Sequence, residues 1–467
     1  MTENLLRKIP SLDKIKGMET AQKMIELHSD SLFVESAREV LDTIRGEIKS
    51  GSVVHDDSSL TPEAILTRIG SFLEAKFLPS LQQAINATGV ILHTGLGRAA
   101  LPPVAQKAIA QVADGYSTLA TDVDSGKRSH RDVHLNDLLC ELTGAEAATV
   151  VNNNAAATML ILNTLAQGKE CIVSRGQLVE IGGSFRMPDV MAASGTVLQE
   201  VGTTNKTHLR DYLAAAGEES SAIMRVHHSN YRIVGFTSEP GIEEIVELAK
   251  KLDLYVIDDL GSGALVDLAQ YGIEHEPLVQ DSIQAGVDVA CFSGDKLIGG
   301  PQAGIIVGKK AIIERIRKNP LARALRIGKL TIAAMEATLR LFLKPEKLTE
   351  EHPVYRMFSM TVEEIEKRTK KMAKPLKAQL AENVDISLID GGSQVGSGAV
   401  PVQTIPTKLL QITPKGSNVE DKAKELRGFK PPVFTRIHKG ALLLDLRTVE
   451  EGKDRIVESA LLEVFSE

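Results

Sequence analysis

The chain has 467 residues, of which 43% are hydrophobic and 25% charged, and its 61 acidic and 54 basic side chains give a formal net charge of −7. This is the composition of an ordinary globular protein with two or three domains, and the acidic balance neither indicates nor excludes a local nucleic-acid-binding surface. No run approaches the roughly 20 apolar residues that a membrane span needs. The N-terminus lacks the apolar core of a signal peptide, and three scattered cysteines favour a reduced, cytoplasmic protein.

The N-terminal part is predicted to be helical. Apolar residues recur near a helical spacing between Leu32 and Ile48, and Gly51 follows them as a stop signal, which predicts a small helical domain over residues 1–60. The polar run "HDDSSLTP" then introduces a predicted linker, residues 61–80.

Residues 81–330 alternate between short β-rich runs and helical or loop segments. Seven such runs are "ATVVNN", "CIVSR", "TVLQEVG", "AIMRVHH", "LYVIDD", "DVACFSG" and "AGIIVG". They predict an α/β domain with a mostly parallel seven-stranded sheet covered by helices on both faces. Residues 331–467 are predicted to form a smaller α+β domain with strands in "VDISLID", "VPVQTIP" and "FTRIHKGALLLDL".

Three of these runs end in polar or charged residues of the kinds found in active sites. Lys296 and, three residues before it, Ser293 follow "DVACF", while Asp258 and Asp259 end "LYVIDD". In "ATVVNNNAAATMLIL" a strand leads through amide and small residues into a helix. Active sites of such sheets lie beyond the carboxyl ends of the strands, so we expect these groups to meet there.

The order of these groups predicts a pyridoxal phosphate enzyme. A lysine amine forms a Schiff base with the cofactor aldehyde, a carboxylate keeps the pyridine nitrogen protonated, and a helix N-terminus with a hydroxyl holds the phosphate. Lys296 suits the first role and an aspartate the second. The phosphate would contact Asn153, Asn154, Ala155 and Ser293.

Five segments carry a family resemblance: "INATGVILHTGLGRAALP", "LTGAEAATVVNNNAAATMLIL", "VEIGGSFRMPDVM", "VIDDLGSGALVDL" and "FSGDKLIGGPQAGIIVGKK". They resemble bacterial selenocysteine synthase, the L-seryl-tRNA(Sec) selenium transferase family, over nearly the whole chain. The resemblance implies a fold-type I, aspartate aminotransferase-like core that binds pyridoxal phosphate. The segments "LLRKIPSLDKI" and "AREVLDTIRGEI" resemble the family's N-terminal tRNA-binding domain.

The resemblance also implies roles for single residues. Lys296 resembles the Schiff-base lysine and Asp258 the partner of the pyridine nitrogen, with its neighbour Asp259 as the rival. Three arginines resemble the family's selenium-donor site: Arg98, Arg323 and Arg326. In the loop "SGKRSHRD" the chain departs from a simpler Gly-x-Arg-Gly-Ser-Arg pattern, so the arginine that serves the active site could be any of several basic residues: Lys127, Arg128 and Arg131.

The implied reaction converts L-seryl-tRNA(Sec) to L-selenocysteinyl-tRNA(Sec). Water is eliminated from the seryl group to give a dehydroalanyl intermediate, and selenium from selenophosphate is added. The family implies a homodecamer, a pentamer of dimers, with active sites at dimer interfaces. Two other readings stay open: a paralogue that performs β-elimination on a small amino or sugar acid, and a non-catalytic tRNA-binding protein on this scaffold. The N-terminal domain disfavours the first, and the presence of Lys296, Asp258 and Ser293 disfavours the second.

Overall fold

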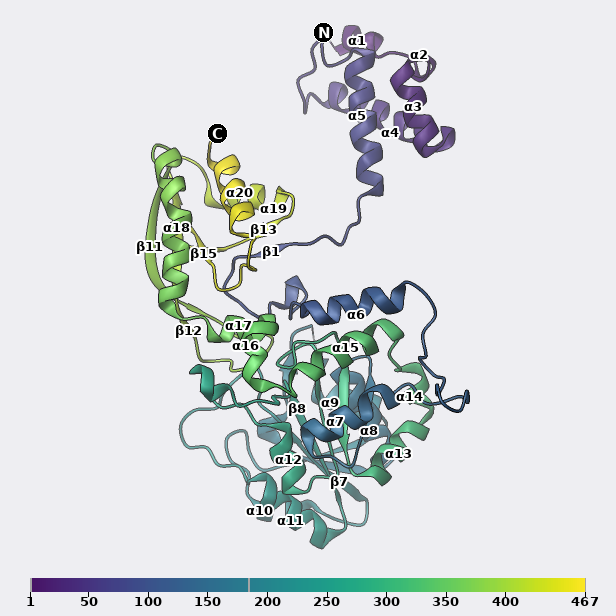
Figure 1. The fold of residues 1–467 in the computed structure, drawn as a ribbon, viewed down its shortest axis with the longest axis vertical. Helices are drawn as coiled ribbons and strands as arrows, with labels where there is room; N and C mark the ends of the chain where they lie inside the picture. The colour runs from purple at the N-terminus through teal and green to yellow at the C-terminus, as the bar shows by residue number, and fades with distance from the viewer. Residues whose placement is uncertain (1, 184, 467) are drawn as a thin grey trace. The chain divides into compact units, whose positions relative to one another are not determined.

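The structure, a computed structural model, describes residues 2–183 and 185–466. The chain divides into two compact units, residues 1–83 and 84–467, which are described separately (Figure 1). Among the described residues, no helix has the length and apolar character needed to cross a membrane.

The first unit is helical. Its elements are α1 (Thr2–Lys8), α2 (Leu12–Lys16), α3 (Glu19–His28), α4 (Asp30–Ser50) and α5 (Pro62–Phe77). The expected linker at 61–80 is therefore wrong, because most of it is helix α5. The Thr61 side chain caps this helix, Pro62 starts it, and its apolar residues, including Ile65 and Ile69, are buried in one core with those of α4. The prediction missed this helix because the polar run "HDDSSLTP", which ends at the first residue of α5, indicates the start of a longer linker.

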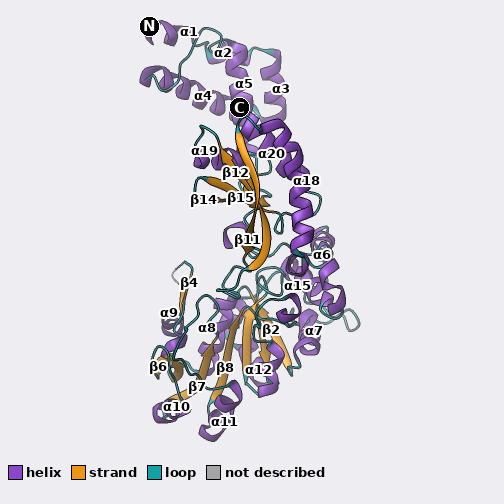
Figure 2. Cartoon of the chain, turned by 90° about the vertical axis from the view of Figure 1, so that its left-hand side faces the viewer, coloured by secondary structure: helices purple, strands orange, loops and turns teal. Residues whose placement is uncertain are grey.

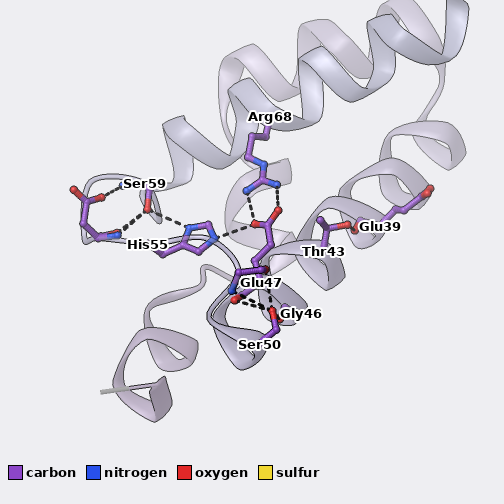
Figure 3. Close-up of polar contacts among 10 residues, drawn as sticks. Glu39, Thr43, Gly46, Glu47, Ser50, His55, Ser59 and Arg68 are labelled. Carbon is purple, nitrogen blue, oxygen red and sulfur yellow. Dashed lines mark hydrogen bonds and ion pairs between the residues drawn. The ribbon is translucent and has the colours of Figure 1, made fainter. Parts of the chain in front are cut away.

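A partly buried carboxylate joins the two longest helices of this unit (Figure 3). Glu47 of α4 accepts hydrogen bonds from both terminal nitrogens of Arg68 on α5, each at 2.9 Å, and His55 Nε2 lies 2.9 Å from it. These contacts, the Arg68 hydrogen bond first, lower the pKa of Glu47. Because His55 belongs to the segment between the helices, the Glu47 carboxylate also anchors that segment.

The second unit is built on a seven-stranded sheet. The strand order is β2 (Ala147–Val151), β10 (Gly304–Gly308), β9 (Val289–Ser293), β8 (Tyr255–Gly261), β7 (Ser220–Val226), β3 (Glu170–Ser174) and β6 (Val197–Val201). Strand β10 runs antiparallel to both its neighbours, and the other four pairs are parallel. Each of the seven predicted strands is present, and the predicted mostly parallel sheet is confirmed.

Helices cover both faces of this sheet (Figure 2). One apolar core holds residues of α7 (Val133–Thr143), α10 (Leu209–Ala215), α11 (Ile242–Leu252), α12 (Val279–Ala285) and α15 (Lys329–Leu341), with α6 (Pro103–Ala113) against α15. The other core holds residues of α8 (Asn154–Leu165), α9 (Met187–Ala193) and α13 (Lys310–Lys318), with α14 (Pro320–Ala324) beside them. Strands that are buried on both faces read as continuous apolar runs, which is why the sequence indicated them.

A smaller antiparallel sheet follows, in the order β11 (Val384–Ser393), β12 (Ile405–Pro414), β15 (Ala441–Asp445) and β14 (Arg436–His438). Its core holds α18 (Val362–Leu380), α19 (Val419–Gly428) and α20 (Asp454–Ser466). In Figure 1, α18 runs beside β11, in agreement with their contacts. The remaining pairs are β1 (Ile85–Asn86) with β13 (Val433–Phe434) and β4 (Glu180–Ile181) with β5 (Phe185–Arg186).

The expected boundary at residue 330 does not separate the two cores. Helices α15, α16 (Leu348–Glu351) and α17 (Pro353–Ser359) pack into the core of the large sheet. Conversely, β1 lies in the core of the small sheet. The predicted strand in "VPVQTIP" is present only from Ile405 onward, because Val400 turns the chain with a φ of +46°. Burial of apolar faces, and not chain order, therefore decides which sheet each element joins.

Candidate active site

Lys296 lies just beyond the end of β9 and is buried, with 6% of its surface exposed. It lines a cavity of about 230 Å³ together with most of the groups that the sequence singled out. The predicted members present there are Arg98, Asn153, Asn154, Ala155, Ser293 and Lys296. The expectation that strand ends bring these groups together is supported by this cavity.

The environment of Lys296 favours a neutral amine. Burial lowers the pKa of Lys296, and the Arg98 guanidinium lowers it further, while the carboxylates of Asp259, Asp295 and Glu276 oppose the shift. A neutral amine is the form that attacks an aldehyde or accepts a proton. The surroundings of Lys296 therefore favour both attack on an aldehyde and acceptance of a proton.

The two adjacent aspartates of β8 have different surroundings. Asp258 is fully buried; it accepts two hydrogen bonds of 2.7 Å from Arg225 and one of 2.6 Å from Ser282. It does not line the Lys296 cavity, whereas Asp259 does. Consecutive strand residues point to opposite faces, so only one of the pair can reach the cavity. Of the two aspartates that the sequence left open, we therefore propose Asp259 as the partner of the pyridine nitrogen.

Asp259 is held in place by three donors. Asn154 Nδ2 lies 2.8 Å and the Gly261 backbone N–H 3.0 Å from one carboxylate oxygen, and Thr158 Oγ1 lies 2.8 Å from the other. Burial raises the pKa of Asp259, while these hydrogen bonds and Lys296 oppose the rise. A cationic group brought into the cavity would favour the ionised carboxylate.

The start of helix α8 forms another wall of the cavity. The Asn153 side chain caps the helix by accepting from the Ala156 backbone N–H at 2.8 Å. Strand β10 approaches this turn so closely that a Cβ on Gly304 would lie 2.1 Å from the Asn153 carbonyl oxygen. The Asn154 side-chain oxygen is buried and has no hydrogen-bond partner among the described residues. A helix N-terminus that faces a cavity in this way is suited to an anion.

The expected anion-binding arginines do not meet within one chain. Arg98 lines the Lys296 cavity and forms a 2.6 Å ion pair with Asp295. Arg323 and Arg326 line a different cavity of about 600 Å³, which Arg128 and Arg131 also line. Burial, followed by repulsion from the neighbouring arginines, lowers the pKa of Arg131. This second cavity therefore gathers positive charge that an anion would neutralise.

Comparison with known proteins identifies the family. The family model described as L-seryl-tRNA selenium transferase matches residues 84–450. The chain belongs to this family. It is 47% identical to the L-seryl-tRNA(Sec) selenium transferase of Alkaliphilus metalliredigens over 98% of both chains. The Geobacter sulfurreducens protein of the same name is 44% identical over 99% of this chain and 100% of that protein.

A solved structure, described as D-glucosaminate-6-phosphate ammonia-lyase, matches with a TM-score of 0.56 and 20% identity, covering 82% of this chain and 96% of that chain. This likeness shows the fold alone. The predicted fold-type I core and the predicted resemblance to the L-seryl-tRNA selenium transferase family are both confirmed.

Among the residues that line the Lys296 cavity, sequence reasoning missed the titratable His227. His227 follows β7 directly and lines this cavity. The strand-end rule that selected Lys296 could have found it, because the predicted strand "AIMRVHH" ends in two histidines. Nothing in the spacing of a single strand indicates its neighbour Glu276, which belongs to a distant loop.

Proposed function

We propose that this chain converts L-seryl-tRNA(Sec) to L-selenocysteinyl-tRNA(Sec), with selenophosphate as the selenium donor and pyridoxal phosphate as the cofactor. The observation that carries the proposal is the cavity that joins a buried lysine, a buried carboxylate and a helix N-terminus in a chain of this family. We also propose the cytoplasm as its location, consistent with three free cysteines.

The cavity fits pyridoxal phosphate. Lys296 would hold the aldehyde carbon and Asp259 the pyridine nitrogen. The phosphate would accept hydrogen bonds from the backbone N–H groups at the start of α8 and from the hydroxyl of Ser293. When bound, the cofactor supplies an electron-withdrawing ring that stabilises negative charge on the seryl α-carbon.

The residues of the chain would divide the remaining tasks. The Lys296 amine, whose pKa is lowered by burial, would accept the seryl α-proton. Asn154 and Thr158 would keep the Asp259 carboxylate oriented toward the cavity. Apolar side chains that line the cavity would limit the access of water; they are Val179, Ile181, Phe185 and Met187.

We propose that Arg323 and Arg326 of one copy of the chain bind the selenium donor together with Arg98 in the Lys296 cavity of a second copy. The distribution of the arginines over two cavities is consistent with sites shared between two chains, and we propose the homodecamer, a pentamer of dimers, as the assembly. Guanidinium groups suit the oxygens of a phosphate-like anion.

The Arg323→Ala and Arg326→Ala variants are each expected to raise the selenophosphate concentration that gives half-maximal rate by about tenfold or more, since a charge-assisted hydrogen bond contributes about 1.5–3 kcal/mol. Steady-state kinetics with varied selenophosphate measures this. The control is Lys310→Ala, which removes an exposed lysine that does not line the cavity of Arg323 and Arg326. An equal rise in the control variant, or no rise in either arginine variant, would contradict the assignment.

Removing residues 1–83 is expected to weaken the binding of seryl-tRNA(Sec) by at least about tenfold, a loss of roughly 1.4 kcal/mol. These residues form a compact unit of their own and supply no group to the Lys296 cavity. The truncated chain should therefore bind pyridoxal phosphate as the full chain does. Filter binding at several salt concentrations measures tRNA affinity, which should fall as salt rises. Unchanged tRNA affinity would exclude the recognition role. It would point instead to two other basic segments: residues 309–329, with eight Lys or Arg and one Glu, and residues 367–377, with six Lys or Arg and no acidic residue.

The decisive test of the proposed function is incubation of the full chain with seryl-tRNA(Sec), selenophosphate and pyridoxal phosphate. Mass spectrometry of the hydrolysed aminoacyl group should detect selenocysteine. Binding of tRNA without any change in the seryl group would favour a non-catalytic protein. Elimination from a small amino or sugar acid, with seryl-tRNA(Sec) untouched, would favour the paralogue.

A further inference from the structure

His227 separates two cavities of the second unit. One is the Lys296 cavity, and the other, of about 330 Å³, is lined by polar and charged side chains. Among the described residues that line these cavities, His227 is the one that both share. Its backbone N–H donates to the Asp259 carbonyl oxygen at 2.9 Å, which fixes it beside the predicted cofactor carboxylate. The imidazole is thus placed to act on what enters the Lys296 cavity.

A buried carboxylate orients this histidine. The Glu276 side chain is 7% exposed, and its Oε2 lies 3.2 Å from His227 Nε2. The other Glu276 oxygen accepts from the Val400 backbone N–H at 2.9 Å. A carboxylate held in this way fixes the direction of the imidazole, as in other histidine–carboxylate pairs.

The elimination of water requires two proton transfers. One proton leaves the seryl α-carbon, and one must join the departing β-hydroxyl group, because hydroxide is a poor leaving group. Lys296 is assigned to the first transfer. Asp259 accepts three hydrogen bonds, and Arg98 donates to Asp295 at 2.6 Å. Among the side chains that line this cavity, histidine is the type that ordinarily exchanges protons near neutral pH.

We propose that His227 is the catalytic residue that protonates the departing β-hydroxyl group, with Glu276 as its positioning residue; this role rests on the proposed function. The seryl Cα–H bond breaks, and its proton goes to Lys296 while its electron pair forms the Cα–Cβ double bond. The Cβ–O bond breaks, and the oxygen leaves with its electron pair and takes the His227 proton. One water is released, and no oxidant or reductant is consumed.

The second cavity supplies a route for the return of the proton. It is lined by titratable side chains on the far side of His227: His228, Glu239, Glu274, His275 and Glu276. His228 Nε2 lies 3.5 Å from Glu239. A proton can therefore reach His227 through these groups and water without passing through the Lys296 cavity.

The test compares two leaving groups. The His227→Gln variant is expected to process seryl-tRNA(Sec) about 10²–10⁴-fold more slowly than the unchanged chain, the usual contribution of a general acid. With 3-chloroalanyl-tRNA(Sec) its rate should change less than about threefold, because chloride leaves without a proton. Single-turnover measurements give both rates. The control is His438→Gln, at an exposed histidine of β14 that lines neither cavity, and it should retain the seryl activity.

A second readout separates this role from a structural one. The apo-form of His227→Gln should bind pyridoxal phosphate with unchanged affinity in a fluorescence titration. Equal losses on both substrates, weakened cofactor binding, or an undiminished seryl rate would overturn the role of His227. If the unchanged chain processes neither tRNA, the proposed function fails, and this role fails with it.

Glu276 acts through His227, so its substitutions should move the same ratio of rates. Glu276→Gln is expected to slow the seryl reaction by about tenfold relative to the chloroalanyl reaction, and Glu276→Asp should restore part of the loss. A change that is equal for both substrates would assign Glu276 to stability alone.

Discussion

The Lys296→Ala variant is expected to lose conversion of seryl-tRNA(Sec) by at least about 10³-fold, because one amine serves both as the attachment point of the cofactor and as the base for the α-proton. Lys296 is buried in the cavity, and burial lowers its pKa. Burial in the cavity and a lowered pKa together distinguish Lys296 from an exposed surface lysine. The exposed Lys251, which pairs with Glu247 on α11, provides the matched control, and Lys251→Ala should be fully active.

Covalent labelling checks the same assignment without turnover. Borohydride reduction in the presence of pyridoxal phosphate should leave a pyridoxyl mass increment on the peptide that contains Lys296. Lys296→Ala should show no such increment. A label on another lysine, or conversion that survives the substitution, would refute the assignment.

The Asp259→Asn variant is expected to lower turnover by about 10²–10⁴-fold while the fold is kept, because the pyridine nitrogen loses its anionic partner. Asparagine retains the shape of the side chain and an oxygen that can accept from Thr158 or Asn154. The cofactor should still bind, and its absorbance spectrum should change. Thermal unfolding should stay within a few degrees of the unchanged chain.

Asp258→Asn is the matched comparison and should have the opposite profile. It removes the anionic partner of Arg225 in a buried ion pair, which costs about 3 kcal/mol or more in the free energy of unfolding. Its turnover, measured at a temperature where the variant is folded, should remain close to that of the unchanged chain. Calorimetry measures the loss of stability in both variants, and single-turnover rates show which aspartate the reaction needs. If Asp258→Asn abolishes turnover and Asp259→Asn does not, the cavity assignment is wrong.

The amino-acid sequence determined the strands of the central sheet and most of the polar residues of the candidate site. The central strands are buried on both faces, so they read as apolar runs that local composition reveals. The end of such a run also marks the edge of the sheet where active groups gather. Lys296, Ser293 and the start of α8 were therefore predictable, as was the capping residue Asn153, whose amide satisfies a helix N-terminus by local chemistry.

Only the tertiary structure decided the contacts between distant segments. Because side chains alternate along a strand, the sequence predicts that Asp258 and Asp259 face opposite sides of the sheet. Which of them lies in the Lys296 cavity depends on the packing of α8, whose Asn154 contacts Asp259. Likewise, burial against α4 makes Pro62–Phe77 part of the helical unit. The tertiary fold places Arg98 in a different cavity from Arg323 and Arg326, and it places Glu276 beside His227. These outcomes depend on long-range packing of side chains, which the local periods of 2 and 3.6 residues do not encode.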